Sequence, residues 1–102
     1  MKKFTLYVGL NDKDTKKQKV ATKKAREIVQ NVLLGNVDGY TISEAEGLYR
    51  HESGEITIEK TMRIELLFVE KEQVKAIVGA LKKQLNQESV AVQEETIISE
   101  LW

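Results

Sequence analysis

The feature that most constrains this chain is the order in which its apolar residues change period. Apolar residues first recur at every second position, as in a half-buried strand, and then at helical spacing. After these come two more alternating segments, a second helical segment and a last alternating run. Neither a proline nor a Ser/Gly-rich linker interrupts this order. The pattern predicts strand, helix, strand, strand, helix and strand in a single domain over residues 1–102.

Capping and turn residues give the expected boundaries. Thr15 and Gln18 stand in capping-box spacing, so the first helix is expected to begin at Thr15. Residues 94–102 fit a continued strand, a fifth strand or a final helical turn, and the sequence leaves these three open. The expected strands are 4–10, 40–50, 55–69 and 89–93, and the expected helices are 15–34 and 71–86.

Two crossover helices around a central hairpin are typical of the split βαβ arrangement. The sequence therefore predicts an α+β, ferredoxin-like βαββαβ fold, in which a four-stranded antiparallel sheet carries both helices on one face. The hairpin loop is expected at Glu52-Ser53-Gly54, with Gly54 in the left-handed conformation. That register places Leu48 opposite Ile58, so apolar residues face one another.

The central hairpin is too long for the helices that should cover it. Its strand of 15 residues spans roughly 50 Å, whereas a helix of about 16 residues covers roughly 24 Å. We expect the part that carries Leu48, Tyr49, Arg50, Ile56 and Ile58 to project and to pack on another subunit, as in a dimer or trimer. A break near Gly47 that folds the hairpin back is the alternative.

Charge and composition narrow the classes of partner. Lysine and arginine balance aspartate and glutamate at 16 each, so the chain has no general basic field for nucleic acid. No segment has the roughly 20 apolar residues of a membrane span. The absence of cysteine excludes disulfides and cysteine-ligated metals. A cytoplasmic protein without nucleic-acid or membrane partners is expected.

Few residues have the spacing of a chemical site. His51 with Glu52 and Glu55 could hold a metal, but a single histidine at a loop tip is more typical of a solvated turn. Glu44 and Glu46 share one strand face, where Lys60 is the expected ion-pair partner of Glu46. Phosphate-loop, dinucleotide-binding and hydrolase motifs are absent. We therefore expect no catalytic residue, no metal site and no cofactor.

The run Gly47-Leu48-Tyr49-Arg50 resembles the Gly-Phe-Gly-Arg stretch that follows the second strand in PII-type nitrogen-regulatory signalling proteins. Gly47 and Arg50 match that stretch, whereas Tyr49 does not. The hairpin loop is much shorter than the family's effector loop, and no glycine-rich segment precedes the last strand. The resemblance implies a homo-oligomeric ferredoxin-like protein. We expect its ligand site to include Gly47 and Arg50, together with Tyr49 between them.

Three functional hypotheses follow. The first is a non-enzymatic, homo-oligomeric, PII-like regulatory protein that binds a small ligand or a protein partner between subunits; Arg50 would meet an anionic group and Tyr49 would line the cleft. The second is a small dimeric enzyme similar to cofactor-free monooxygenases, with substrate between sheet and helices. The third is an adaptor protein that binds no ligand.

Overall fold

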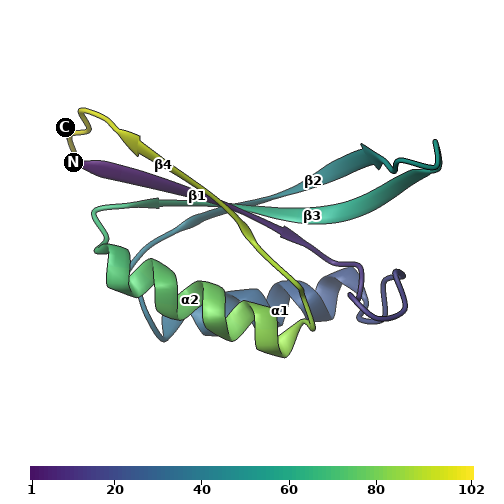
Figure 1. Ribbon diagram of the computed structural model, residues 1–102. Helices are drawn as coiled ribbons and strands as arrows, with labels where there is room; N and C mark the ends of the chain where they lie inside the picture. Colours follow the sequence, from purple (N-terminus) through teal and green to yellow (C-terminus); the bar gives the residue numbers. More distant parts are fainter.

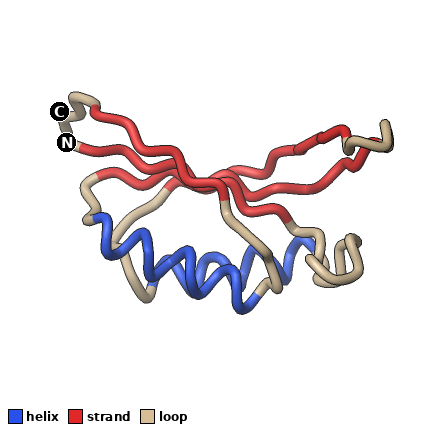
Figure 2. The backbone as a smooth tube through the Cα atoms, viewed as in Figure 1, coloured by secondary structure: helices blue, strands red, loops and turns tan.

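The computed structural model describes residues 1–102 and contains six elements in the order that the sequence predicts (Figure 1). Their bounds are β1 (Lys2–Gly9), α1 (Thr22–Leu34), β2 (Thr41–Arg50), β3 (Ile56–Leu67), α2 (Lys71–Gln84) and β4 (Ala91–Thr96). The four strands form one antiparallel sheet in the order β2-β3-β1-β4. Both helices lie on the same face of the sheet (Figure 2), so the ferredoxin-like α+β fold is confirmed.

The core lies between the sheet and the helices. Phe4, Leu6 and Val8 alternate along β1 and face the helices. A second row of buried residues, on β3, lies beside them. Seventeen buried apolar side chains form one cluster. Because this cluster fills the space between sheet and helices, the opposite face of the sheet is left for a functional site. Neither helix combines the length and the hydropathy that crossing a membrane would need.

The register of the central hairpin is confirmed. Leu48 pairs with Ile58 and Glu46 with Lys60. The backbone N–H of His51 donates to the carbonyl oxygen of Glu55 at 2.8 Å, which closes the loop. Gly54 has φ of +89°, the left-handed conformation that the three-residue loop needs.

The first helix begins at Thr22, so the expected start at Thr15 is wrong. Lys16 has φ of +63°, and its N–H donates to the carbonyl oxygen of Asp12 at 2.8 Å, which closes a turn instead of a helix. The side chain of Gln18 donates to the carbonyl oxygen of Val20. No apolar side chain lies between positions 13 and 19, so a helix there would bury nothing, whereas the loop gains these hydrogen bonds.

The tip of the β2–β3 hairpin extends beyond both helices (Figure 1). Along the helix-facing side of β3, Ile64 and Met62 are fully buried, whereas Ile58 and Ile56 are exposed. The same row of the strand thus runs from the core into solvent. The projection expected from the strand and helix lengths is present.

Residues 94–102 combine a strand with an irregular segment. β4 continues to Thr96, three residues beyond its expected end, and the N–H of Ile97 donates to the carbonyl oxygen of Met1 at 3.0 Å. Beyond that bond, Ile98, Leu101 and Trp102 are almost fully exposed. Residues 97–102 form neither a fifth strand nor a helical turn.

Candidate functional site

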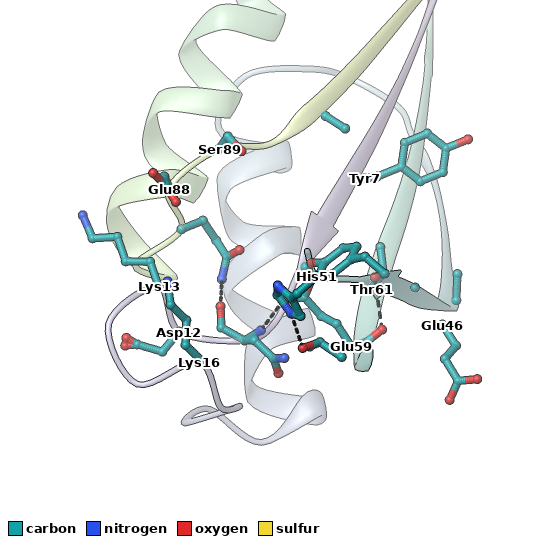
Figure 3. Close-up of a pocket in the computed structure, with 18 of the residues that line it drawn as sticks. Tyr7, Asp12, Lys13, Lys16, Glu46, His51, Glu59, Thr61, Glu88 and Ser89 are labelled. Carbon is teal, nitrogen blue, oxygen red and sulfur yellow. Dashed lines mark hydrogen bonds between the residues drawn. The ribbon is translucent and has the colours of Figure 1, made fainter. Parts of the chain in front are cut away.

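A groove of about 840 Å³ lies on the face of the sheet that the helices leave open. Its floor comes from alternate residues of all four strands, and its rim comes from the β1–α1 loop, the α2–β4 loop and the hairpin loop (Figure 3). The floor residues are Tyr7, Gly9, Ala45, Gly47, Tyr49, Thr57, Glu59, Thr61 and Ala91.

Glu59 is a buried carboxylate in the floor of this groove, with an exposed fraction of 8%. The backbone N–H of Asn11 donates to its Oε2 at 2.8 Å, and the Tyr49 hydroxyl donates to its Oε1. These donors come from a loop and from a neighbouring strand, so both loop and hairpin fix the carboxylate. A buried ionised group without partners would cost several kcal/mol, whereas two donors make its burial tolerable.

The hydrogen bond to Glu59 changes the acidity of Tyr49. That bond, desolvation and the negative charge of Glu59 together raise the pKa of Tyr49 from 10.0 to about 12. The phenol therefore stays protonated at neutral pH and remains a donor. Its ring also meets His51 edge-on, with centroids 6.2 Å apart.

Glycine at position 9 makes room for the Glu59 carboxylate. A Cβ at Gly9 would overlap all three atoms of that carboxylate. Gly47 lies opposite Glu59 on β2, and a Cβ there would stand 3.3 Å from the Thr61 hydroxyl. Gly9 thus leaves the space that the carboxylate occupies, whereas Gly47 leaves room beside Thr61 and the backbone of Glu59.

A polar clamp holds two of the rim loops together. The side-chain amide of Asn86 donates to both carboxylate oxygens of Asp12, at 3.0 and 2.7 Å, and to Asp14 at 2.9 Å. Gln87, which is buried, donates to the carbonyl oxygen of Asn11 at 2.7 Å. The clamp positions the Asn11 N–H that binds Glu59, so it connects the α2–β4 loop to the groove.

The lining carries an excess of negative charge. It contains five carboxylate side chains and two lysines, while His51 adds charge only when protonated. Figure 3 shows Asp12, Lys13 and Glu88 on one side of the view and Glu46 on the other, with Glu59 and His51 between them. Such a groove attracts positively charged molecules. Its walls exclude part of the water and salt that would otherwise screen the charges of the carboxylates.

The residues singled out from the sequence separate in the structure. Gly47 and Tyr49 line the groove. Arg50 is the next residue along β2, so its side chain points to the opposite face of the hairpin, outside the groove. His51 lines the rim, where its Nε2 lies 2.6 Å from the Thr57 hydroxyl.

Sequence reasoning did not single out Glu59, although one signal pointed to it. A glycine inside a strand pattern indicates a close approach of another group to the backbone. Gly9 stands at the end of the first alternating run, and the hairpin register places Gly47 opposite Glu59. The carboxylate between two such glycines marks the centre of the site.

One protein family matches nearly the whole chain. A family model described as "Protein of unknown function (DUF3574)" matches residues 3–99. No curated protein matches the sequence.

Several solved structures are similar to this chain. A phage SAM lyase in complex with S-methyl-5′-thioadenosine is 23% identical, with a TM-score of 0.62 over 92% of this chain and 79% of that one. A DUF3240 family protein from Shewanella baltica OS155 is 10% identical, with a TM-score of 0.57 over 99% and 94%. The B. subtilis GlnK–ATP complex is 15% identical, with a TM-score of 0.49 over 93% of this chain and 84% of that one.

Proposed function

This chain belongs to the DUF3574 family, and we propose that it is a small-molecule-binding protein whose groove takes a positively charged organic ligand. The observation that carries the proposal is the buried Glu59 carboxylate, held by Tyr49 and Asn11 in the floor of the groove. The binding residues would be Glu59, Gly47 and Tyr49. We propose that residues 1–102 act as one domain.

Hydrogen-bonding capacity supports a cationic ligand. A carboxylate offers about four lone-pair sites, and Glu59 uses one for each of its two donors. A ligand that brings a cationic centre or N–H and O–H donors would satisfy the remaining sites. The rings of Tyr7 and Tyr49 also line the groove, and aromatic faces attract onium groups.

The negative lining disfavours the anionic ligand that Arg50 suggested from sequence. Five carboxylates would repel a phosphate, and Arg50 lies on the other face of the hairpin. Arg50 would therefore serve a different contact. The packed cluster between sheet and helices likewise disfavours a monooxygenase-type substrate cavity at that place.

A sulfonium compound with an adenosine group is the specific ligand class that we propose. The phage protein of similar fold is a SAM lyase, and its complex contains S-methyl-5′-thioadenosine. S-adenosylmethionine carries the positive sulfonium that the Glu59 carboxylate and the tyrosine rings would favour, and its ribose hydroxyls could donate to the remaining lone pairs.

Cleavage of that ligand is a second candidate function, favoured by the hydrogen-bonded pair of Glu59 and Tyr49. A carboxylate beside a phenol that stays protonated supplies one proton acceptor and one donor at the same place. The Glu59 carboxylate would take a proton from the carbon next to the one bonded to sulfur, and the electrons of that C–H bond would form a C=C bond. The C–S bond would break at the same time with its electron pair on sulfur, which turns the cation into a neutral thioether. Detection of S-methyl-5′-thioadenosine after incubation of the protein with S-adenosylmethionine would demonstrate this activity.

Self-association is the other part of the proposal. The hairpin exposes Leu48, Ile56 and Ile58, and a two-stranded ribbon with an apolar side gains stability when covered. We infer a homo-oligomer built from copies of this chain.

Isothermal titration calorimetry tests the ligand. We expect S-adenosylmethionine to bind more tightly than neutral S-methyl-5′-thioadenosine, and ATP to bind least. Glu59→Gln should weaken binding of the sulfonium by about 10- to 100-fold, because it removes a charge-assisted contact of about 1.5–3 kcal/mol.

Glu95→Gln is the matched control, since it removes the same charge from an exposed position on β4 outside the groove. It should leave the affinity unchanged. Equal affinity of the wild type and Glu59→Gln for S-adenosylmethionine, or preferential binding of ATP, would contradict the proposal.

A further inference from the structure

Two apolar surfaces lie at opposite ends of this molecule, and neither has a partner within the chain. The first, which we call the hairpin face, consists of Leu48, Ile56 and Ile58 with Arg50 beside them. The second, the terminal segment, is residues 97–102, in which Ile98, Leu101 and Trp102 are almost fully exposed.

The hairpin face is the continuation of the core-facing side of the sheet. Leu48 pairs with Ile58, and Arg50 pairs with Ile56, so all four side chains point to the side on which the helices lie. The helices end before they reach it (Figure 1). The apolar residues of this row therefore resemble core residues, but no helix covers them.

The two surfaces cannot meet within one molecule. Figure 1 places the end of the terminal segment beside the N-terminus, at the far end of the molecule from the hairpin tip. The long dimension of the molecule is 47 Å, and the terminal segment begins at Ile97, which is tied to Met1. Six residues reach at most about 20 Å when extended, so a contact requires a second copy.

The charges on the two surfaces are complementary. Arg50 is an exposed cation within the hairpin face, and Glu100 is an exposed anion between Ile98 and Leu101 of the terminal segment. Apolar side chains around one cation would thus meet apolar side chains around one anion. Two hairpin faces would instead bring two arginines together, which disfavours a symmetric hairpin-to-hairpin contact.

We propose that the terminal segment of one copy packs on the hairpin face of the next, with Glu100 paired to Arg50. The contact is heterologous, because each copy offers two different surfaces, and repetition closes into a ring when the rotation between copies allows it. The inference rests on the proposed self-association and names the surfaces that produce it.

Trp102 gives a direct readout, since it is the only tryptophan of the chain. As the protein concentration rises, we expect the mass measured by light scattering to exceed one chain and the tryptophan emission to shift to shorter wavelength. Both Ile58→Asp and Ile98→Asp should remain monomeric, with the emission of an exposed indole. Leu34→Asp, at an exposed leucine of α1 outside both surfaces, is the matched control and should behave as the wild type.

A mixing experiment separates this contact from other ways of assembling. Ile58→Asp keeps an intact terminal segment, and Ile98→Asp keeps an intact hairpin face, so an equimolar mixture should form a species of two chains although neither variant associates alone. Arg50→Glu should weaken assembly by about tenfold, and Arg50→Glu combined with Glu100→Arg should recover it.

Each contrary result has a distinct meaning. Assembly that persists in Ile98→Asp overturns the terminal-segment contact and leaves self-association through another surface. A wild type that is monomeric at every concentration, with exposed tryptophan emission, overturns both. Circular dichroism of each variant establishes that it has folded.

Discussion

The carboxylate of Glu59 occupies the space in which any side chain at Gly9 would stand. The two residues come from adjacent strands, and the same carboxylate also binds Tyr49 and the backbone of Asn11. The centre of the groove therefore depends on a residue that contributes no side chain.

Gly9→Ala should abolish ligand binding while the protein still folds. The added methyl group would push the flexible Glu59 side chain away from its two donors, at a cost of about 1–3 kcal/mol in the free energy of unfolding. Chemical denaturation and calorimetric titration measure the two effects.

Gly79→Ala is the matched control for that change. A Cβ at Gly79 meets nothing within 4 Å, and the residue lies inside α2, so the variant should gain about 0.5–1 kcal/mol and bind normally. Unchanged ligand affinity of Gly9→Ala would show that the position of Glu59 does not matter for binding.

The phenol of Tyr49 should titrate later than an ordinary tyrosine. Its pKa in the folded protein is raised from 10.0 to about 12, so the folded state holds the proton more tightly than the unfolded state. The stability that this provides is fully present below about pH 10 and is lost as the pH rises through about 12.

Phenolate absorbance against pH measures this directly, because the chain has three tyrosines and one of them should ionise late. Glu59→Gln should return that tyrosine toward the usual range, since it removes the negative charge and weakens the acceptor. A titration curve that Glu59→Gln leaves unchanged, in protein that circular dichroism reports as folded, would refute the assigned cause.

Asn86→Asp should open the clamp between the two rim loops. The new carboxylate would face Asp12 and Asp14, which now accept hydrogen bonds from the Asn86 amide. We expect a loss of about 1–3 kcal/mol in the free energy of unfolding at neutral pH.

Chemical denaturation at neutral pH checks the clamp. Gln93→Glu, which adds the same charge at an exposed position of β4, should change stability little. Equal loss in the two variants would mean that the effect comes from net charge and not from the clamp.

Local patterns in the sequence were enough to predict the order of elements and the hairpin register. A shift of one residue in the pairing of β2 with β3 would turn every side chain to the other face, so the apolar pairs Leu48–Ile58 and Ile42–Ile64 specify the register strongly. The left-handed Gly54 in the loop agrees with it. The start of α1 could not be predicted in the same way, since the loop around Asp12 is held by Asn86, far away in the sequence.

Only part of the candidate site could be predicted from the sequence. Gly47 and Tyr49 were expected in the site from the run 47–50, and they line the groove. Arg50 was expected beside them, but the alternation of a strand sends it to the opposite face, where the terminal segment of another copy is proposed to meet it.

By itself, the sequence determined the fold, because period and turn chemistry act over a few residues and agree at every element. Only the tertiary structure decided that Glu59 is buried, that Gly9 makes space for it and that loops from both ends of the chain complete the groove. Those properties depend on which distant segments pack together. A carboxylate in an alternating strand therefore reads as a surface residue until the neighbours that desolvate it are known.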